Sequence, residues 1–554
     1  MTGDPVTGDG DGDPLTGDAL DGEAFVLVAN RLPVDEVTAG NGGGGANATE
    51  TVTSPDGRVW RRSPGGLVSA LYPLLAGRSQ ATWVGWTGAP GPAPEPFELA
   101  GFTGDGSTAA RPGIRIQPVP LSEQEFDEYY EGYANATIWP LYHDAVQTPV
   151  HHREWAAANR AVNQRFAEAV DRVSPHGAMV WVHDYQLQLV PAMLRERRPD
   201  LRIGFFLHIP FPPVELFMQL PERLEVIKGL LGADLVGFQT PRGAQNFLHL
   251  AQQLLGLRRR GPWVQAGDRW VRAEAFPISI DVDEMQRLVS LPSVRTRAAE
   301  IRDELGHPKV VILGVDRLDY TKGIGQRLRA YRELLSEGRV STPDTVFVQV
   351  ATPSRERVEH YGELREDVER EVGHINGEFG RVGIPAVHYL RQSYSREELA
   401  ALYLAADVMA VTPLRDGMNL VAKEYVAARG DLRGALVLSE FAGAARELKH
   451  AYMCNPHDIN SIKDALMRAV EDDPQSAAKR MTAMRRHLRR HDVRRWASDF
   501  LTALQMTEAG PDGNGTNGTR TNGRAGNGKG GNGEEVPGRG VIADDANHEG
   551  PGAA

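Results

Sequence analysis

Short apolar runs alternate with longer amphipathic stretches along most of the 554 residues. The apolar runs are rich in β-branched residues, as strands are, and the stretches between them repeat apolar residues at helical spacing. This alternation predicts an α/β fold with parallel sheets covered by helices on both faces. The predicted strands are residues 25–29, 82–85, 179–182, 203–207, 235–238, 310–315, 345–350, 387–390, 408–411 and 436–438. The predicted helices are residues 186–197, 242–255, 326–335, 357–372, 396–404, 419–428, 461–469 and 476–490.

The pattern is interrupted once, at residues 276–281, before a new series begins with the strand at 310. This interruption predicts two domains of ordinary size, residues 24–278 and residues 279–490. An amphipathic stretch follows at residues 491–507, and its apolar face is predicted to pack back onto the first domain.

Both ends of the chain differ in composition from the rest. Residues 1–23 repeat the tripeptide TGD among Gly, Asp and Pro, and residues 508–554 are a Gly/Asn/Thr tract. Neither end can bury enough apolar surface to offset the entropy lost on ordering, so both are predicted to be disordered tails. Gly40, Gly42 and Gly45 match G-x-G-x-x-G, but no strand leads directly into them and no apolar helix follows. We interpret this segment as a flexible surface loop rather than a dinucleotide site.

Composition and charge exclude several classes of function. A hydrophobic fraction of 41% is ordinary for a globular protein, and a net charge of −12 argues against a broad nucleic-acid surface or a basic membrane patch. The single cysteine, Cys454, cannot form an internal disulfide or a cysteine metal site. The N-terminus lacks the order of a signal peptide, and no run of 18 apolar residues occurs. We therefore expect a cytoplasmic protein without a membrane or nucleic-acid partner.

Residue spacings typical of metal sites are missing from the sequence. His151 and His152 are adjacent but have no further ligand at metal spacing, and neither H-E-x-x-H nor a P-loop occurs. No metal and no cofactor are predicted.

Basic residues follow the ends of several predicted strands. Arg31, Arg317, Lys322 and Arg355 all occupy such positions, where ligands gather in open α/β sheets. Phosphate groups need local positive charge in an acidic protein, so these residues together indicate two anionic ligands. The alternative is that each basic residue makes a surface ion pair, and for Arg317 the partner would be Asp316 or Asp319.

The segment after the strand at 408–411 has the features of a nucleotide-sugar site. Asp416 can accept hydrogen bonds from sugar hydroxyls, Gly417 allows close backbone approach to a ligand, and Glu424 can bind a vicinal diol. The backbone N–H groups that open the next helix, from Met418, Asn419 and Leu420, can bind oxygen atoms. Arg317 and Lys322 would stabilise a leaving diphosphate. The alternative is an N-capped core helix with incidental acids.

Two weaker signals come from the first half of the chain. Gly65 and Gly66 lie at a predicted helix start, which allows close approach to phosphate or sugar. Tyr130 and Trp139 supply aromatic rings with polar tips, which suit a carbohydrate face and ordinary packing equally well.

The strings SPGGL, HDYQL, GFFLHIPFP, DRLDYTKG and TPLRDGMNLVAKEYVAA occur in this order within residues 25–504, and as a set they resemble the trehalose-6-phosphate synthase family of retaining glycosyltransferases. The resemblance implies a GT-B fold, in which two Rossmann-like domains face each other across a cleft. It implies transfer of glucose from UDP-glucose, with GDP- or ADP-glucose left open, to glucose 6-phosphate. It leaves a homo-oligomer open and implies a separate trehalose-phosphate phosphatase, because the string DVDEM at 281–285 lacks the last residue of a phosphatase motif.

The resemblance also assigns roles to residues. It places Arg31, Tyr130, Trp139, Asp184 and Arg355 at the acceptor. At the donor it places Gly65, Gly66, Arg317, Lys322, Tyr394, Asp416, Leu420, Val421 and Glu424, and these join Gly417, Met418 and Asn419, which the segment after residue 411 already indicates. The residues implied in catalysis are His208, Arg317, Lys322 and Asp416. No protein nucleophile is implied, because in this family the departing phosphate is taken to deprotonate the incoming hydroxyl.

Three alternatives stay open. A relative with another acceptor would be a glucosylglycerol-phosphate synthase or a pseudo-glycosyltransferase, and the retained acceptor residues argue against it. A catalytically silent sugar-phosphate sensor is disfavoured by the intact donor residues. A glycoside hydrolase could use Asp184 and Asp416 as its carboxylate pair, but basic residues aimed at phosphate would then serve no purpose.

Overall fold

The computed structural model describes residues 24–37, 51–63, 68, 71–72, 75, 80–99, 113–355 and 359–511. The described residues belong to one compact unit. The predicted tail at residues 1–23, the predicted loop around Gly42 and, from the predicted tail at 508–554, residues 512–554 lie outside the described residues. Residues 508–511 are described, and the last short helix, η6 (Met506–Ala509), extends into them.

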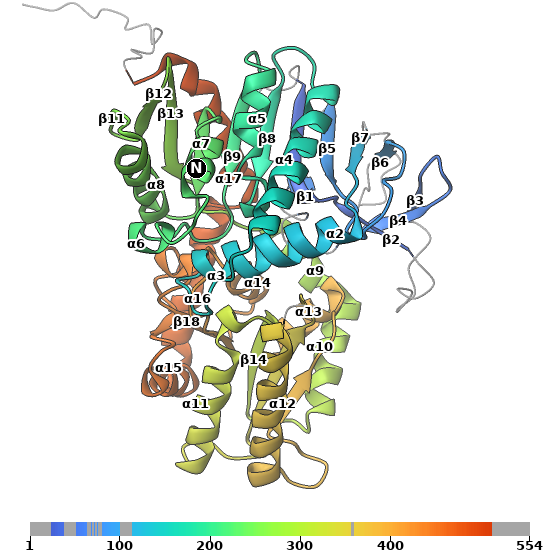
Figure 1. The fold of residues 1–554 in the computed structure, drawn as a ribbon. Coiled ribbons are helices and arrows are strands. Elements are labelled where there is room, and N and C mark those ends of the chain that lie inside the picture. Colours follow the sequence, from blue (N-terminus) through green and yellow to red (C-terminus); the bar gives the residue numbers. More distant parts are fainter. Residues whose placement is uncertain are drawn as a thin grey trace, which may run out of the picture. The chain divides into compact units, whose positions relative to one another are not determined.

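A ten-stranded sheet forms the first half of the chain (Figure 1). Its order is β11-β12-β13-β10-β9-β8-β1-β5-β7-β6, and the pairs from β13 to β7 are all parallel. The strands are β1 (Phe25–Arg31), β5 (Ala81–Trp86), β6 (Phe97–Leu99), β7 (Ile114–Val119), β8 (Met179–His183), β9 (Arg202–Phe206), β10 (Leu235–Phe238), β11 (Arg259–Arg260), β12 (Trp263–Ala266) and β13 (Arg269–Ala275). The strands β2 (Val34–Glu36), β4 (Val59–Arg62) and β3 (Thr51–Thr53) form a separate three-stranded sheet in this order.

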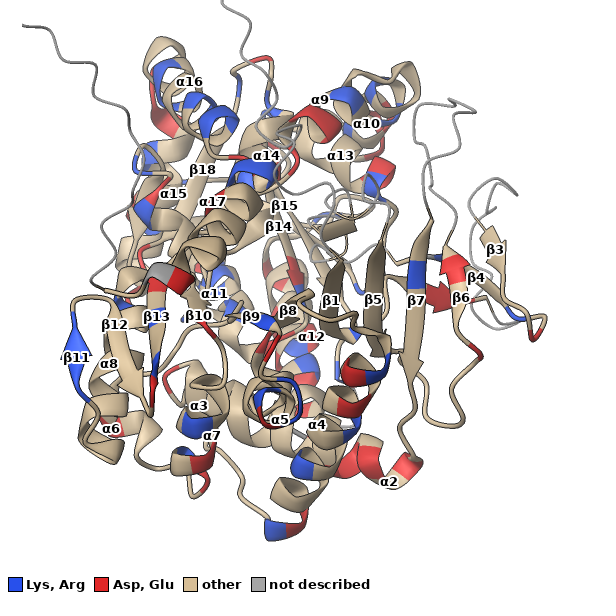
Figure 2. Cartoon of the chain, turned by 90° about the horizontal axis from the view of Figure 1, so that it is seen from above, with Lys and Arg blue, Asp and Glu red and all other residues tan. Residues whose placement is uncertain are grey.

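Helices cover both faces of this sheet. Along β1, Phe25 and Leu27 belong to one buried cluster and Val26 and Val28 to another, so the strand is buried on both sides. This is why it reads as a continuous apolar run. The helices of this half are α2 (Glu123–Glu125), the π-helix η2 (Phe126–Ile138), α3 (Trp139–Tyr142), α4 (Arg153–Val173), η3 (Tyr185–Leu187), α5 (Val190–Arg197), α6 (Val214–Phe217), α7 (Arg223–Leu230) and α8 (Pro241–Leu255). Figure 2 shows basic and acidic residues side by side on α4 and α7, as expected of solvated helix surfaces.

A six-stranded, fully parallel sheet forms the second half, in the order β16-β15-β14-β17-β18-β19. Its strands are β14 (Val310–Arg317), β15 (Thr345–Thr352), β16 (Val387–Leu390), β17 (Val408–Val411), β18 (Ala435–Ser439) and β19 (Tyr452–Cys454). The helices are α9 (Val282–Ser290), α10 (Pro292–Glu304), η4 (Tyr320–Lys322), α11 (Ile324–Ser336), α12 (Glu359–Phe379), α13 (Arg396–Ala405), α14 (Leu420–Ala428), η5 (Gly443–Arg446), α15 (Ile459–Glu471) and α16 (Pro474–Arg490).

Both sheets have the strand order of a Rossmann fold. In each half the chain builds outward from a central strand, β1 or β14, and then continues on the other side of it, with β8 or β17. Ligands of such sheets bind at the carboxyl ends of the strands where the direction reverses. The topology therefore points to the segments after β1, β8, β14 and β17.

The last long helix, α17 (Val493–Gln505), lies beside β9 (Figure 1). The Phe500 ring stacks on Trp181 with centroids 4.5 Å apart, and Trp496 Nε1 donates to the Phe276 carbonyl at 3.2 Å. A Cβ at Gly204 or Gly237 would meet the Phe500 ring at 2.8 or 2.6 Å, so these two glycines make room for it. The helix that follows the second sheet thus packs on the first.

The ten predicted strands are all present, with boundaries shifted by a residue or two. Among the elements that sequence reasoning missed are β7 and β13, in which charged or polar residues interrupt the apolar run, and the helices η2, α4 and α7. No helix in the described part of the chain is long and apolar enough to cross a membrane.

Candidate active site

A cavity of about 640 Å³ lies where the carboxyl ends of strands from both sheets meet, a size common for ligand sites. Most of the sequence-predicted site residues line it: Arg31, Tyr130, Trp139, Asp184, His208, Arg317, Lys322, Arg355, Asp416, Met418, Asn419, Leu420, Val421 and Glu424. Gly65 and Gly66 lie outside the described residues. Tyr394 and Gly417 are not among the residues that line the cavity, and the Tyr394 hydroxyl instead accepts from Gln392 Nε2 at 2.5 Å.

Arg355 joins the two halves of the protein. It follows β15 with a backbone φ of 51°, and its Nη1 donates to Asp319 Oδ2 at 3.0 Å and to the Tyr361 hydroxyl at 2.5 Å. Its Nη2 donates to the Tyr185 hydroxyl at 3.2 Å, and the guanidinium lies 3.8 Å from the Trp139 ring centroid. A cation from the second half is therefore held against the aromatic wall of the first.

Asp319 is the buried counter-charge of this cluster. Burial alone would raise its pKa, but the charges of Arg355, Arg317 and Lys322 outweigh burial and hold the pKa well below its ordinary value. Arg317 Nη2 is 3.8 Å from Asp319 Oδ2, so this predicted alternative pairing is present but loose, and the Arg317 side chain stays partly exposed. Asp316, the other predicted partner of Arg317, pairs with Arg327 at 2.6 Å.

Lys322 and Asp416 form an ion pair inside the cavity. Lys322 Nζ is 2.6 Å from Asp416 Oδ2, which also accepts from Asn419 Nδ2 at 3.1 Å. Burial would raise the pKa of Asp416, but Lys322 outweighs it and the pKa falls below its ordinary value. The cation predicted for a diphosphate is thus neutralised by the acid predicted for a sugar.

The N-terminus of α14 opens toward the cavity. Asn419, with φ of 76°, caps the helix by accepting from the Ala422 N–H at 3.1 Å. The N–H groups of Leu420 and Val421 occupy the first two helical positions, which have no partner within the helix, and both residues line the cavity. Glu424, one turn further, accepts from the Tyr403 hydroxyl at 2.9 Å, and burial raises its pKa.

The reason for a glycine at 417 differs from the one predicted. A Cβ there would lie 2.3 Å from the His208 carbonyl oxygen and 3.0 Å from Ile209 Cα. The close approach that Gly417 permits is therefore between the backbones of the two halves, rather than between backbone and ligand.

Asp184 and His208 line the cavity on the side of the first sheet. Asp184 follows β8 with φ of 74°, its Oδ1 accepts from the His208 N–H at 3.2 Å, and burial raises its pKa to about 6. Burial lowers the pKa of His208 to about 3, so its ring is neutral at pH 7. His208 Nε2 lies 3.0 Å from Nδ1 of the buried His183.

Arg31 and Tyr130 both lie near the ring of Trp86. The Arg31 guanidinium is 5.1 Å from the Trp86 ring centroid, and Tyr130 is 5.5 Å from the same ring. Asp35 Oδ1 is 3.6 Å from Arg31 Nη2, and 45% of the Arg31 side chain is exposed. Arg31 can therefore turn toward an anion.

Three residues of the site were given no functional role from the sequence. Tyr185 and His143 line the cavity, and Asp319, considered only as a partner of Arg317, contacts Arg317 and Arg355, which line it. Asp319 and Tyr185 lie within motifs already singled out, DRLDYTKG and HDYQL, and a search of those motifs could have found them. His143 gave no such signal: its Nδ1 lies 2.7 Å from the Trp139 carbonyl, and burial lowers its pKa to about 3.

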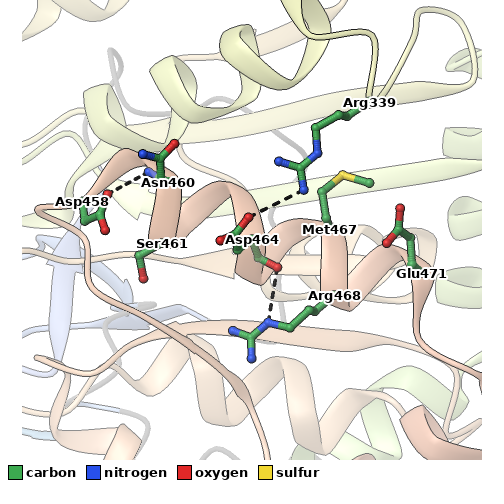
Figure 3. A pocket seen from close by; sticks show the side chains of 8 residues that line it. All are labelled: Arg339, Asp458, Asn460, Ser461, Asp464, Met467, Arg468 and Glu471. Carbon is green, nitrogen blue, oxygen red and sulfur yellow. Dashed lines mark hydrogen bonds and ion pairs between the residues drawn. The ribbon is translucent and has the colours of Figure 1, made fainter.

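A second hollow, of about 550 Å³, lies along α15 and holds none of the predicted residues (Figure 3). Within it Arg339 pairs with Asp464 at 3.6 Å, and Arg468 Nε donates to the Asp464 carbonyl at 3.3 Å. Within the described ranges no group of three or more His, Cys, Asp or Glu side chains could hold a metal ion.

Comparisons with known proteins cover nearly all of this structure. A family model described as glycosyltransferase family 20 matches residues 24–506. A trehalose-6-phosphate synthase from Mycobacterium sp. (strain KMS) is 56% identical over 518 residues, which are 92% of this chain and 98% of that protein. An alpha,alpha-trehalose-phosphate synthase (UDP-forming) from Burkholderia xenovorans, solved in complex with glucose-6-phosphate, is similar with a TM-score of 0.75 and 32% identity, over 87% of this chain and all of that one. A structure from E. coli bound with UDP-2-fluoro glucose has a TM-score of 0.75 and 31% identity, over 87% and 99% of the two chains. These likenesses confirm the predicted α/β GT-B fold.

Proposed function

The chain belongs to glycosyltransferase family 20, the family of its trehalose-6-phosphate synthase relatives, and from this premise we propose that it transfers glucose from UDP-glucose to glucose 6-phosphate. The products would be α,α-trehalose 6-phosphate and UDP. The observation that carries the proposal is the gathering of Arg31, Arg317, Lys322 and Arg355 on one cavity in a chain of net charge −12. Two phosphate-bearing substrates explain four such cations.

The donor would bind on the second half. Arg317, Lys322 and the free N–H groups of Leu420 and Val421 can hold the diphosphate, and Glu424 can accept hydrogen bonds from the ribose diol. Lys322 would then exchange Asp416 for a phosphate oxygen. The carboxylate of Asp416, once released, can accept hydrogen bonds from hydroxyls of the transferred glucose. A uridine-containing donor is supported by the relative bound with UDP-2-fluoro glucose.

The acceptor would bind between the halves. Arg355 and Arg31 can hold its phosphate, Asp184 can accept from its sugar hydroxyls, and Trp139 with Tyr130 can face the ring. The relative solved with glucose-6-phosphate supports this acceptor. Glycerol 3-phosphate would leave the Asp184 carboxylate and the aromatic wall without a sugar ring to bind.

We propose that the reaction retains the anomeric configuration without a nucleophile from the protein. The bond from the anomeric carbon to the diphosphate oxygen breaks as the acceptor hydroxyl attacks from the same face. The departing phosphate oxygen takes the proton of that hydroxyl. Arg317, Lys322 and the N–H groups of α14 stabilise the negative charge on the leaving diphosphate, the kind of contribution that is usually largest. Contact between the two halves limits access of water.

The test is release of nucleoside diphosphate from purified protein, with product mass and anomeric proton couplings. UDP-, GDP- and ADP-glucose are compared, each with glucose 6-phosphate, with glycerol 3-phosphate and without acceptor. Release that requires glucose 6-phosphate, and an α,α product from UDP-glucose, supports the proposal. Equal release without acceptor indicates a hydrolase, and binding without turnover indicates a sensor. Activity is expected to survive a chelator, because the cations proposed for the diphosphate are side chains.

The product keeps its phosphate, so we propose that a separate phosphatase consumes it. Light scattering on the purified chain tests whether it forms a homo-oligomer.

A further inference from the structure

Two guanidinium groups in the cavity, those of Arg317 and Arg355, have two partners in common. Arg355 Nη1 is 3.0 Å and Arg317 Nη2 is 3.8 Å from the same oxygen, Asp319 Oδ2. The two groups also lie over one indole ring, that of Trp139, at 3.8 and 5.1 Å from its centroid. In the function proposed above, Arg317 serves the donor diphosphate and Arg355 serves the acceptor phosphate.

Asp319 cannot move with either arginine, because its other carboxylate oxygen, Oδ1, is hydrogen-bonded to Thr321. Oδ1 accepts from the Thr321 N–H at 2.9 Å and from the Thr321 hydroxyl at 2.8 Å, and the side chain is fully buried. The Asp319 carbonyl accepts from the Lys322 N–H at 3.0 Å, so the same turn carries another cation of the cavity. One fixed negative charge is thus shared by two positive groups, Arg355, which is buried and held by several partners, and Arg317, which is 43% exposed and can move.

We propose that Asp319 is a positioning residue that couples the donor and acceptor phosphate sites, an inference that rests on the proposed function. One carboxylate cannot neutralise two guanidinium groups, so a unit of positive charge is left for incoming phosphate. When the diphosphate engages Arg317, the attraction of Asp319 falls on Arg355 alone and holds it in place for the acceptor. When Arg355 is absent, Asp319 draws Arg317 from 3.8 Å into a full ion pair and away from the diphosphate.

A double-mutant cycle on UDP binding tests the coupling. Calorimetry gives the Kd of UDP for the full chain as wild type, Arg355→Gln, Asp319→Asn and the double variant. Arg355→Gln removes the same long-range positive charge from the wild-type and the Asp319→Asn proteins. The difference between its effects on the Kd of UDP in these two backgrounds therefore measures the coupling that acts through Asp319. We expect Arg355→Gln to weaken UDP binding at least fivefold more in the wild-type background than in the Asp319→Asn background. Ratios that agree within twofold overturn the proposal.

Turnover gives a second readout that a purely structural role would not move. Asp319→Asn is expected to lower kcat at least tenfold while UDP binding is not weakened, because removing a negative charge does not oppose an anion. Weaker UDP binding in Asp319→Asn contradicts the proposal. The matched control is Glu447→Gln. It removes a carboxylate that lies 2.6 Å from the buried Lys423 Nζ, in the same half as Asp319 but not on the cavity. In the Glu447→Gln background, Arg355→Gln is expected to weaken UDP binding by the same factor as in the wild-type background.

Two outcomes separate this proposal from the proposed function. If the wild type neither binds UDP nor transfers glucose, the proposed function fails and the coupling with it. If the wild type transfers glucose and the cycle is additive, only the coupling is overturned. Should Asp319→Asn not fold, Asp319→Glu replaces it, because it keeps the charge and moves it by one methylene. The cycle is then expected to give a ratio different from that of the wild type, and an unchanged ratio overturns the proposal.

Discussion

Substituting alanine for Gly417 tests whether the contact between the two halves controls catalysis. The added Cβ would lie 2.3 Å from the His208 carbonyl oxygen, whereas carbon and oxygen atoms in contact are usually about 3.3 Å apart or more. The backbones must therefore separate by about 1 Å at this point. A displacement of that size at reacting groups lowers a rate by about 100-fold, which corresponds to about 2.7 kcal/mol of barrier.

The expected signature of Gly417→Ala is a kcat about 100-fold below wild type with UDP affinity nearly unchanged. UDP binding should survive because Arg317, Lys322 and α14 all belong to the second half. Acceptor-independent hydrolysis of UDP-glucose should rise relative to transfer, because separated halves admit water. The assays are steady-state kinetics with and without glucose 6-phosphate, and calorimetry of UDP binding.

The matched control is Gly325→Ala, at the start of α11, where an added Cβ meets nothing within 4 Å. It should leave kcat unchanged and stabilise the fold by about 0.4–1 kcal/mol, through the lower entropy of the unfolded chain. A Gly417→Ala variant with kcat within threefold of wild type would refute the reasoning, since the contact would then adjust without disturbing the reacting groups.

Three further substitutions have definite expected outcomes. Lys322→Gln should lower kcat by about 10²–10³ in the UDP-release assay, as for loss of one donor to a developing anion, and a loss confined to KM would contradict this. Asp184→Asn should abolish turnover yet raise the unfolding temperature above pH 6, because burial raises the pKa of Asp184 to about 6 and its ionised form is disfavoured in the folded state. Scanning fluorimetry should show this gain shrinking as pH falls from about 6 toward the ordinary pKa of 3.8, where the wild-type carboxyl takes up its proton, and a constant gain would contradict the assignment. Phe500→Ala should lower the free energy of unfolding by about 3–5 kcal/mol in urea titration, because the ring is fully buried against Trp181, and a loss below about 1 kcal/mol would contradict the packing role of α17.

Strands buried on both faces could be predicted from the sequence, because burial itself selects a continuous apolar run. β1 and β14 are examples, and their side chains enter cores on both sides of a sheet. β13 reads RWVRAEA and is half-buried, so its pattern resembles that of a surface segment. The π-helix η2 buries residues at a spacing that matches neither a strand nor an α-helix, so periodicity gave no signal for it.

The positions of site residues at strand ends could also be predicted, because parallel topology sends all such ends to one edge. Which side chains meet there could not. Lys322 pairs with Asp416 across 94 residues, and Arg355 reaches the Tyr185 hydroxyl across 170 residues. The residues next to Lys322 or Arg355 in the chain do not indicate which distant side chain each will contact.

The sequence by itself determined the α/β alternation and a set of cations and acids at strand ends, since both follow from the local periodicity of burial. Only the tertiary structure decided that Asp319 is shared by Arg317 and Arg355, and that Gly417 serves the approach of the two halves. The physical reason is that burial is reflected in neighbouring residues, whereas pairing and close contact depend on how distant segments pack. A carboxylate or a glycine has the same local pattern whether its neighbour in space is a ligand or another part of the chain.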